Sequence, residues 1–218
     1  MHIVNPAILI ADDHQIVREG LRSLLAREPW VRVVGEAAEG RTAVRLAREL
    51  APDVILMDVA MPELNGIEAT RLIVAEFPAI RIIALSMHDD RRYVLEMLKA
   101  GAKGYLLKDC AFKDVVKAIR VVVANRSYLG SEVADILVQD FRASAASKES
   151  SPWLTPSPRE RQVLQLLAEG VSSHRIAESL HISIKTVESH RSQLMAKLRV
   201  RSVAELTKYA IREGLTAP

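Results

Sequence analysis

Short, continuous apolar runs alternate with helical patterns along the N-terminal part of the chain, and this alternation limits the folds open to it. The runs occupy residues 7–11, 31–37, 53–57, 80–85 and 104–107. Runs of this kind are typical of strands buried on both faces of a parallel sheet. Helical patterns lie near residues 14–28, 40–51, 65–76, 91–101 and 111–125. The alternation predicts an α/β domain of five βα units with a parallel five-stranded sheet.

Polar side chains follow four of these runs. Asp12 and Asp13 follow the first run, Asp58 the third, Ser86 the fourth and Lys108 the fifth. Because the carboxyl ends of parallel strands meet at one crevice, these side chains should lie together. Three carboxylates favour Mg²⁺, and a lysine and a serine suit phosphoryl oxygens. A carboxylate at the position of Asp58 can act as a nucleophile and form an aspartyl phosphate.

The composition indicates a water-soluble protein that works in a reducing compartment. No apolar run approaches the ~20 residues that cross a bilayer, so no membrane partner is expected. The first residues lack a basic stretch followed by an apolar one, so no signal peptide is visible. The single cysteine, Cys110, cannot form an internal disulfide and suits the cytoplasm.

The second part of the chain has a different character. A helix is expected at about 131–142, followed by a small, polar stretch at 143–152 that suggests a flexible tether. Beyond it the patterns are purely helical, near 157–169, 172–180, 183–198 and 202–213. We therefore expect a domain over 1–128, a linker over 129–152 and a small all-α domain over 153–218. Residues 152–218 carry ten lysines and arginines against six acidic residues, which favours a polyanionic partner.

Two of these helices have the spacing of a helix-turn-helix. His181, Ile182 and Ser183 join the helix at 172–180 to the next one, and Ser183 is well placed as the N-cap of that second helix. Such a second helix enters the major groove of double-stranded DNA. Val187, Leu194 and Leu198 form its inward stripe. The candidates for base contacts are Lys185, Glu188, Ser189 and Ser192, and those for phosphate contacts are Lys185, Thr186, Arg191 and Lys197.

Four segments resemble the receiver domain of bacterial two-component response regulators, over residues 7–126. They are ILIADDH (8–14), DVILMDVAMPELNG (53–66), IIALSMHDD (82–90) and GAKGYLLKD (101–109). The resemblance implies that a sensor histidine kinase phosphorylates Asp58 in the presence of Mg²⁺. It further implies that Asp13 binds Mg²⁺ directly, Asp12 through water, and Ala60 through its backbone carbonyl.

The same resemblance assigns a switch and leaves one property open. Ser86 and Tyr105 match the hydroxyl and the aromatic residue that receivers move on phosphorylation. Ala60 and His88 occupy positions that tune the lifetime of the phosphoryl group in the family. An alanine cannot help to position an attacking water, whereas a histidine can, so the two residues do not indicate whether the lifetime is long or short.

Residues 154–206 resemble the helix-turn-helix domain shared by the NarL and LuxR families. The matching elements include Thr155-Pro156, Gly170, Ile176-Ala177, Thr186-Val187 and Lys197-Leu198. Together, the two halves resemble a NarL/FixJ-type response regulator, which implies a homodimer on two DNA half-sites after phosphorylation. The helix near 202–213 is then the expected dimer contact.

This sequence departs from the usual helix-turn-helix pattern at three places. Ser157-Pro158 extends the usual entry, Arg199 replaces a frequent glycine, and Glu188 replaces a frequent lysine. An acidic residue would repel phosphates but accept a hydrogen bond from cytosine N4, so we expect Glu188 to influence operator preference.

Two other classes of function would use parts of the same pattern. A phosphatase of the haloacid dehalogenase type would use Asp58 as nucleophile, but it needs a general acid at the position of Ala60. A ligand-sensing LuxR-type regulator would need an apolar pocket rather than an acidic crevice. The expected protein is therefore not an enzyme, beyond assisting its own phosphorylation and dephosphorylation.

Overall fold

The computed structural model describes residues 5–87, 91–109, 112–146, 156–198, 200–213 and 215–216. The chain forms two compact units, Met1–Ala146 and Ser147–Pro218. His88, Cys110, Arg199 and the stretch 147–155 lie outside the described residues. Among the described helices, none combines the length and the apolar character that a membrane crossing requires.

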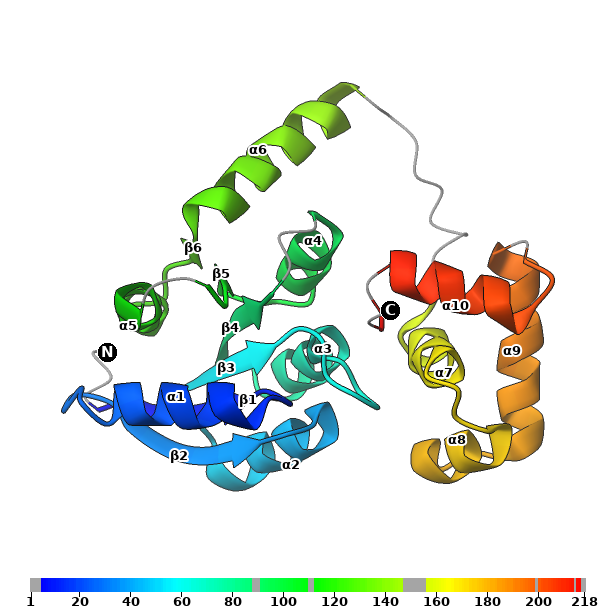
Figure 1. Ribbon diagram of the computed structural model, residues 1–218, viewed down its shortest axis with the longest axis horizontal. Helices are drawn as coiled ribbons and strands as arrows, with labels where there is room; N and C mark the ends of the chain where they lie inside the picture. Colours follow the sequence, from blue (N-terminus) through cyan, green and yellow to red (C-terminus); the bar gives the residue numbers. More distant parts are fainter. Residues whose placement is uncertain are drawn as a thin grey trace. The chain divides into compact units, whose positions relative to one another are not determined.

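The first unit contains a parallel sheet of six strands in the order β2-β1-β3-β4-β5-β6 (Figure 1). The strands are β1 (Ala7–Ala11), β2 (Arg32–Ala37), β3 (Val54–Asp58), β4 (Arg81–Ser86), β5 (Gly104–Leu107) and β6 (Tyr128–Leu129). The five predicted strands are confirmed, but the prediction of a five-stranded sheet was one strand short. The extra strand, β6, has two residues and pairs with Gly104 and Tyr105 of β5, so it leaves no apolar run in the sequence.

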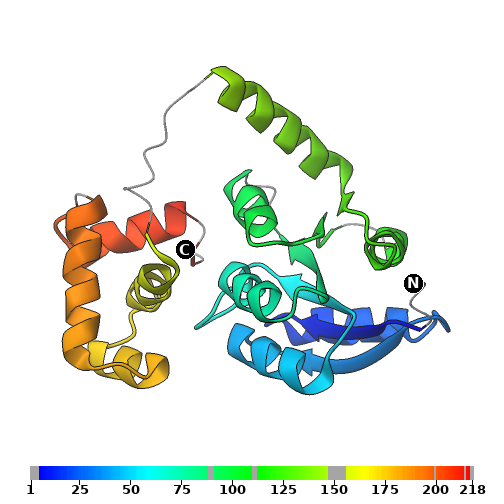
Figure 2. The same cartoon turned by 180° about the vertical axis from the view of Figure 1, so that it is seen from behind.

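Helices cover both faces of this sheet, as Figures 1 and 2 show from opposite sides. They are α1 (Gln15–Leu25), α2 (Gly40–Leu50), α3 (Gly66–Glu76), α4 (Arg91–Lys99) and α5 (Phe112–Val123). Helices α1 and α5 pack on the face that carries Ile8 and Ile10. Helices α2, α3 and α4 pack on the face that carries Leu9 and Ala11. Successive residues of one interior strand therefore enter opposite cores, which is why β1 and β3 are buried along their whole length, whereas the edge strand β2 is only partly buried.

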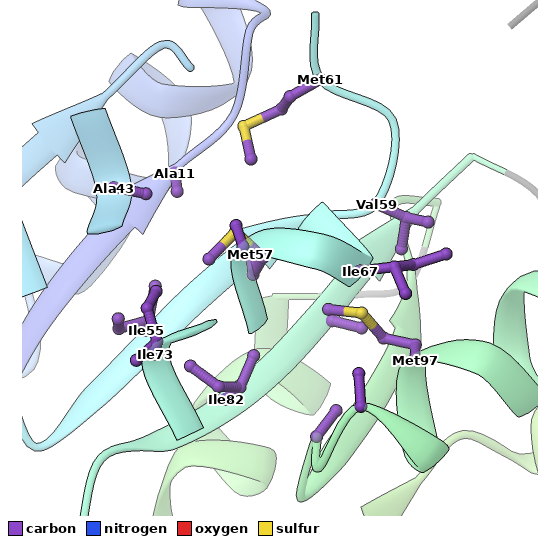
Figure 3. Packing of buried hydrophobic residues seen from close by; sticks show 14 of the residues in the cluster. Ala11, Ala43, Ile55, Met57, Val59, Met61, Ile67, Ile73, Ile82 and Met97 are labelled. Atoms are coloured by element: carbon purple, nitrogen blue, oxygen red, sulfur yellow. The ribbon is translucent and has the colours of Figure 1, made fainter. Parts of the chain in front are cut away.

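The core beneath α2, α3 and α4 is the larger of the two apolar clusters in this unit. Figure 3 shows part of it, with Met57 and Ile82 from the strands and Ile67 and Met97 from the helices. Val133 belongs to the same core and is fully buried. It comes from α6 (Ser131–Ala146), so this helix is packed onto the first unit.

The second unit is all-α, as predicted. Its helices are α7 (Pro158–Ala168), α8 (Ser173–Leu180), α9 (Ile184–Leu198) and α10 (Val203–Arg212). Ser157 caps α7 in a reciprocal arrangement with Glu160, and Pro158 occupies the first helical turn. The unusual Ser157-Pro158 entry is therefore a helix start. All four helices contribute to the core of the second unit. Its buried residues include Val163, Leu164, Ile176, Val187, Leu194 and Leu206.

Candidate functional site

The strand ends of the first unit bring three predicted residues into direct contact. Asp12 follows β1, Asp58 ends β3, and Lys108 follows β5. The Lys108 Nζ lies 2.8 Å from Asp12 Oδ2 and 2.8 Å from Asp58 Oδ2. Ser86 ends the intervening strand β4, and its backbone carbonyl accepts a hydrogen bond from the Lys108 N–H at 2.7 Å. The strand-end pattern thus places these four residues at one crevice.

Burial separates the members of this crevice. The side chain of Asp12 is fully buried, those of Asp58 and Lys108 are 4% and 6% exposed, and that of Asp13 is 34% exposed. Within the described part of the chain, neither Asp12 Oδ2 nor Asp58 Oδ2 accepts a hydrogen bond of good geometry. The ammonium therefore holds them by charge and close approach, and both oxygens keep capacity for a further cationic partner.

The electrostatics of Asp58 follow from this packing. Burial raises its pKa from 3.8 to about 7, and the neighbouring Asp12 carboxylate acts in the same direction. Lys108 and the Ala60 N–H, which lies 3.3 Å from Asp58 Oδ1, act in the opposite direction. For Lys108, burial acts to lower the pKa, but its contacts with Asp12 and Asp58 outweigh burial and raise the pKa. Lys108 is therefore a stable ammonium beside a carboxyl group that ionises with difficulty.

The acidic residues are arranged as a divalent cation requires. Ligand atoms of Asp12, Asp13, His14 and Asp58 all lie within 4.8 Å of one another. Two buried carboxylate oxygens that share one ammonium and a third, accessible carboxylate suit a hard cation that keeps some of its water. The residues present therefore fit a divalent metal ion.

His14 is a member of this site that sequence reasoning missed. Its Nδ1 lies 2.7 Å from Asp13 Oδ1 and 3.4 Å from Asp12 Oδ1. The only signal was its place directly after two aspartates, and a single exposed histidine seldom attracts notice on that ground.

Backbone packing fixes the position of Asp58. The Gly66 N–H donates to the Val59 carbonyl at 2.9 Å, which folds the start of α3 back over the end of β3. Asn65 caps this helix by accepting a hydrogen bond from the Glu68 N–H at 2.9 Å. A Cβ on Gly66 would lie 1.8 Å from the Asp58 carbonyl oxygen, so only glycine allows this approach.

The predicted switch residues are both buried. Ser86 is 1% exposed, and Tyr105 is fully buried in the core that contains Val133. The Gly130 N–H donates to the Tyr105 carbonyl at 3.1 Å, and Leu129 pairs with Tyr105 across β5 and β6. Tyr105 is thus joined directly to the segment that leads into α6.

The stabilising effect expected of a divalent cation at this site should depend on pH. A carboxyl group whose pKa is raised to about 7 contributes stability that is complete below its unfolded value and is lost as pH rises through about 7. A cation needs the ionised carboxylates and reverses this loss. We expect magnesium chloride to raise the melting temperature clearly at about pH 8 and little at about pH 5.5. Equal gains at the two pH values would contradict the assignment, and Asp58→Asn should weaken the pH dependence.

The second unit displays most of the predicted DNA-contact residues. Val187 and Leu194 are buried, as expected for the inward stripe of α9, whereas Lys185, Ser189 and Ser192 are exposed. The Ser183 hydroxyl caps α9 by accepting from the Thr186 N–H at 3.0 Å and lies 2.8 Å from the Thr186 hydroxyl. The exposed stripe begins at this capped end of the helix.

Three charged candidates on α9 have partners within the unit. Lys197 Nζ lies 2.8 Å from Glu160 Oε2, the carboxylate that also caps α7. Arg191 Nη2 lies 2.9 Å from Glu188 Oε2, and Glu188 Oε1 accepts a hydrogen bond from the Ser173 hydroxyl at 2.6 Å. Lys197 therefore ties α9 to α7, while Arg191 and Glu188 stand together beside α8.

Both units match known families. Residues 8–120 match the family model described as response regulator receiver domain, and residues 155–210 match that described as bacterial regulatory proteins, luxR family. The transcriptional regulatory protein DegU of Brevibacillus brevis is 38% identical over 220 residues, covering 95% of this chain and 93% of DegU.

Solved structures of RcsB are similar over almost the whole chain. RcsB from Salmonella enterica serovar Typhimurium, bound to promoter rprA in the presence of the phosphomimetic BeF3-, is 31% identical with a TM-score of 0.63. This likeness covers 94% of this chain and 98% of RcsB. A structure of two RcsB dimers bound to two parallel DNAs is also 31% identical, with a TM-score of 0.60, over 94% of this chain and 97% of that one.

Proposed function

The chain belongs to the two-component response regulators of the LuxR type (NarL/FixJ family), and on that premise we propose that phosphorylation of Asp58 controls its binding to DNA. The observation that carries this proposal is the crevice itself. One nearly buried carboxylate lies 2.8 Å from an ammonium and beside two further aspartates. This arrangement suits a phosphoryl acceptor better than a structural ion pair, which would not gather three aspartates around one ammonium.

Each residue of the crevice has a role in the proposed reaction. A carboxylate oxygen of Asp58 attacks the phosphorus of a phosphohistidine on a sensor histidine kinase. The P–O bond to Asp58 forms as the P–N bond breaks, and the released imidazole takes a proton from water. Lys108 then pairs with a phosphoryl oxygen, and the Ser86 hydroxyl donates to another.

Magnesium is the metal we propose for this site. Asp12, Asp13, Asp58 and the Ala60 backbone carbonyl would hold it, with Asp12 acting through water. When bound, it neutralises the negative charge that the carboxylates and the phosphoryl group bring together.

We further propose that the signal leaves the crevice through Ser86 and Tyr105. A hydroxyl drawn toward the phosphoryl group empties space that the Tyr105 ring can enter. Tyr105 is paired with Leu129 and hydrogen-bonded to Gly130, so its movement reaches β6 and the base of α6. The phosphoryl group only biases an equilibrium between two arrangements that both exist beforehand.

The partner of the second unit is double-stranded DNA. We propose that α9 enters the major groove and presents Lys185, Glu188, Ser189 and Ser192 to base edges. Thr186 and Arg191 lie beside them, and Lys197, a further candidate for a phosphate contact, is paired with Glu160. Since RcsB is seen as dimers on DNA, we propose a homodimer on two half-sites, with α10 as the contact.

The two alternatives are a ligand-sensing regulator and a phosphatase. The ligand-sensing alternative is wrong, because residues 8–120 match a receiver domain. We propose that the chain does not turn over external phosphoesters, because the methyl group of Ala60 supplies no general acid to a leaving group.

Adding a small phosphodonor with magnesium should convert the full chain from one subunit to two and raise its affinity for DNA. Light scattering and a DNA-binding titration, each with and without donor, measure the two effects. A mass that stays at one chain while DNA affinity rises would contradict the proposed dimer but not the switch. No change in either quantity would contradict both.

A further inference from the structure

Resting on the proposed DNA-binding function, we propose that Glu188 and Ser173 are positioning residues that hold Arg191 for guanine in the major groove. Glu188 accordingly acts on operator preference through Arg191, in addition to its place among the residues that face the base edges. The geometry behind this is a chain of three side chains that joins α8 to α9.

The two carboxylate oxygens of Glu188 have different partners. Oε1 accepts the Ser173 hydroxyl proton at 2.6 Å, and Oε2 lies 2.9 Å from Arg191 Nη2. Ser173 is the first residue of α8, so the carboxylate is anchored on a neighbouring helix. A glutamate held at one oxygen loses rotamer freedom, and the arginine that it binds becomes oriented as well.

The position of the pair suits base recognition. The side chains of Arg191 and Glu188 are 38% and 40% exposed, so they are neither buried in the core nor free in solvent. Arg191 is three residues after Glu188 and one before the exposed Ser192, at the edge of the stripe proposed to face the groove. A guanidinium has five N–H donors, so the contact with Glu188 leaves enough for a two-point contact with guanine O6 and N7.

Charge explains why an acid is tolerated here. A lone glutamate on this face would repel phosphates, and a lone arginine would be drawn to the nearest one. Paired at 2.9 Å, the two contribute almost no net charge. The pair therefore adds little to non-specific binding and reserves Arg191 for a contact that depends on sequence.

The test uses the full chain treated with a phosphodonor. One readout is selection from a random-sequence duplex library, and the other is the salt dependence of binding to one arbitrary duplex. Glu188→Gln should reduce the preference for guanine at one operator position by about tenfold. It should also free Arg191 for a phosphate, so that the salt slope of non-specific binding steepens by about one. Ser173→Ala should change both quantities in the same direction by less.

Controls separate this role from a structural one. Ser179→Ala is the matched control, because that hydroxyl donates to the Ile176 carbonyl of its own helix, and it should change neither readout. Arg191→Gln should lose the same guanine preference, and adding it to Glu188→Gln should cancel the steeper salt slope. A slope that stays steep in the double variant would show that Glu188 acts alone and would overturn the proposal.

The remaining outcomes are also decisive. A uniform loss of binding with a lower melting temperature in Glu188→Gln would overturn the proposal in favour of a structural role. A selection profile that the Glu188 and Ser173 variants share with the wild type would overturn this inference alone. A wild-type chain that selects no sequence would overturn the DNA-binding function on which the inference rests.

Discussion

Replacing Asp58 with asparagine should abolish covalent labelling by a small phosphodonor and the donor-induced gain in DNA affinity. The amide keeps the shape of the carboxyl group but has no nucleophilic oxygen anion. The fold should survive, because burial raises the pKa of Asp58 to about 7 and its negative charge repels that of Asp12. A neutral side chain removes that repulsion. Intact-protein mass spectrometry measures the labelling, and thermal unfolding checks the fold.

Asp109→Asn is the matched control for this experiment. Asp109 is exposed and follows Lys108 directly. Its replacement by asparagine therefore removes one negative charge close to the crevice, as the replacement of Asp58 does. It should leave labelling and DNA affinity at wild-type levels. Labelling that persists in the Asp58 variant, at any residue and with an undiminished gain in DNA affinity, would show that the acceptor lies elsewhere.

Replacing Gly66 with alanine should destabilise the first unit by about 3 kcal/mol, at the upper end of what inserted methyl groups cost. The added Cβ would lie 1.8 Å from the Asp58 carbonyl oxygen, a distance that backbone movement must relieve. The element that moves is either the end of β3 or the start of α3, so the acceptor carboxylate moves too. We therefore expect slower labelling of Asp58 as well as a lower midpoint of urea unfolding.

Gly20→Ala should stabilise the same unit, in contrast to the replacement of Gly66. Gly20 lies inside α1, and a Cβ there would meet nothing within 4 Å. Alanine at an open helical position stabilises by about 0.5–1 kcal/mol, because the unfolded chain loses freedom. If both variants destabilised the protein equally, the close approach at Gly66 would not be the cause.

Most of the first unit could be predicted because four of its strands, β1, β3, β4 and β5, lie inside the sheet. Such strands are apolar except near their ends, and their carboxyl ends share one edge, which located Asp12, Asp58, Ser86 and Lys108 together. The sixth strand could not be predicted in this way. Tyr128 and Leu129 form a strand only because Gly104 and Tyr105 offer an open edge, and that pairing depends on tertiary structure.

The DNA-contact residues show where a helical pattern stops being informative. Spacing identified the buried stripe of α9 correctly through Val187 and Leu194. It could not show that Lys197 is bound to Glu160, which lies 37 residues earlier. Nor could it show that Glu188 meets Ser173. Long charged side chains choose among partners from other helices, and only their arrangement in space identifies the partner.

The ammonium of Lys108 has a consequence for how such a protein is made in a cell. Its contacts with Asp12 and Asp58 supply a permanent countercharge from within the chain. A newly synthesised polypeptide can therefore close its acidic crevice without waiting for an ion. Folding is independent of metal supply in this respect, unlike that of domains assembled around a structural zinc. On the magnesium dependence proposed above, a shortage of magnesium would silence the regulator without reducing the amount of it that is present.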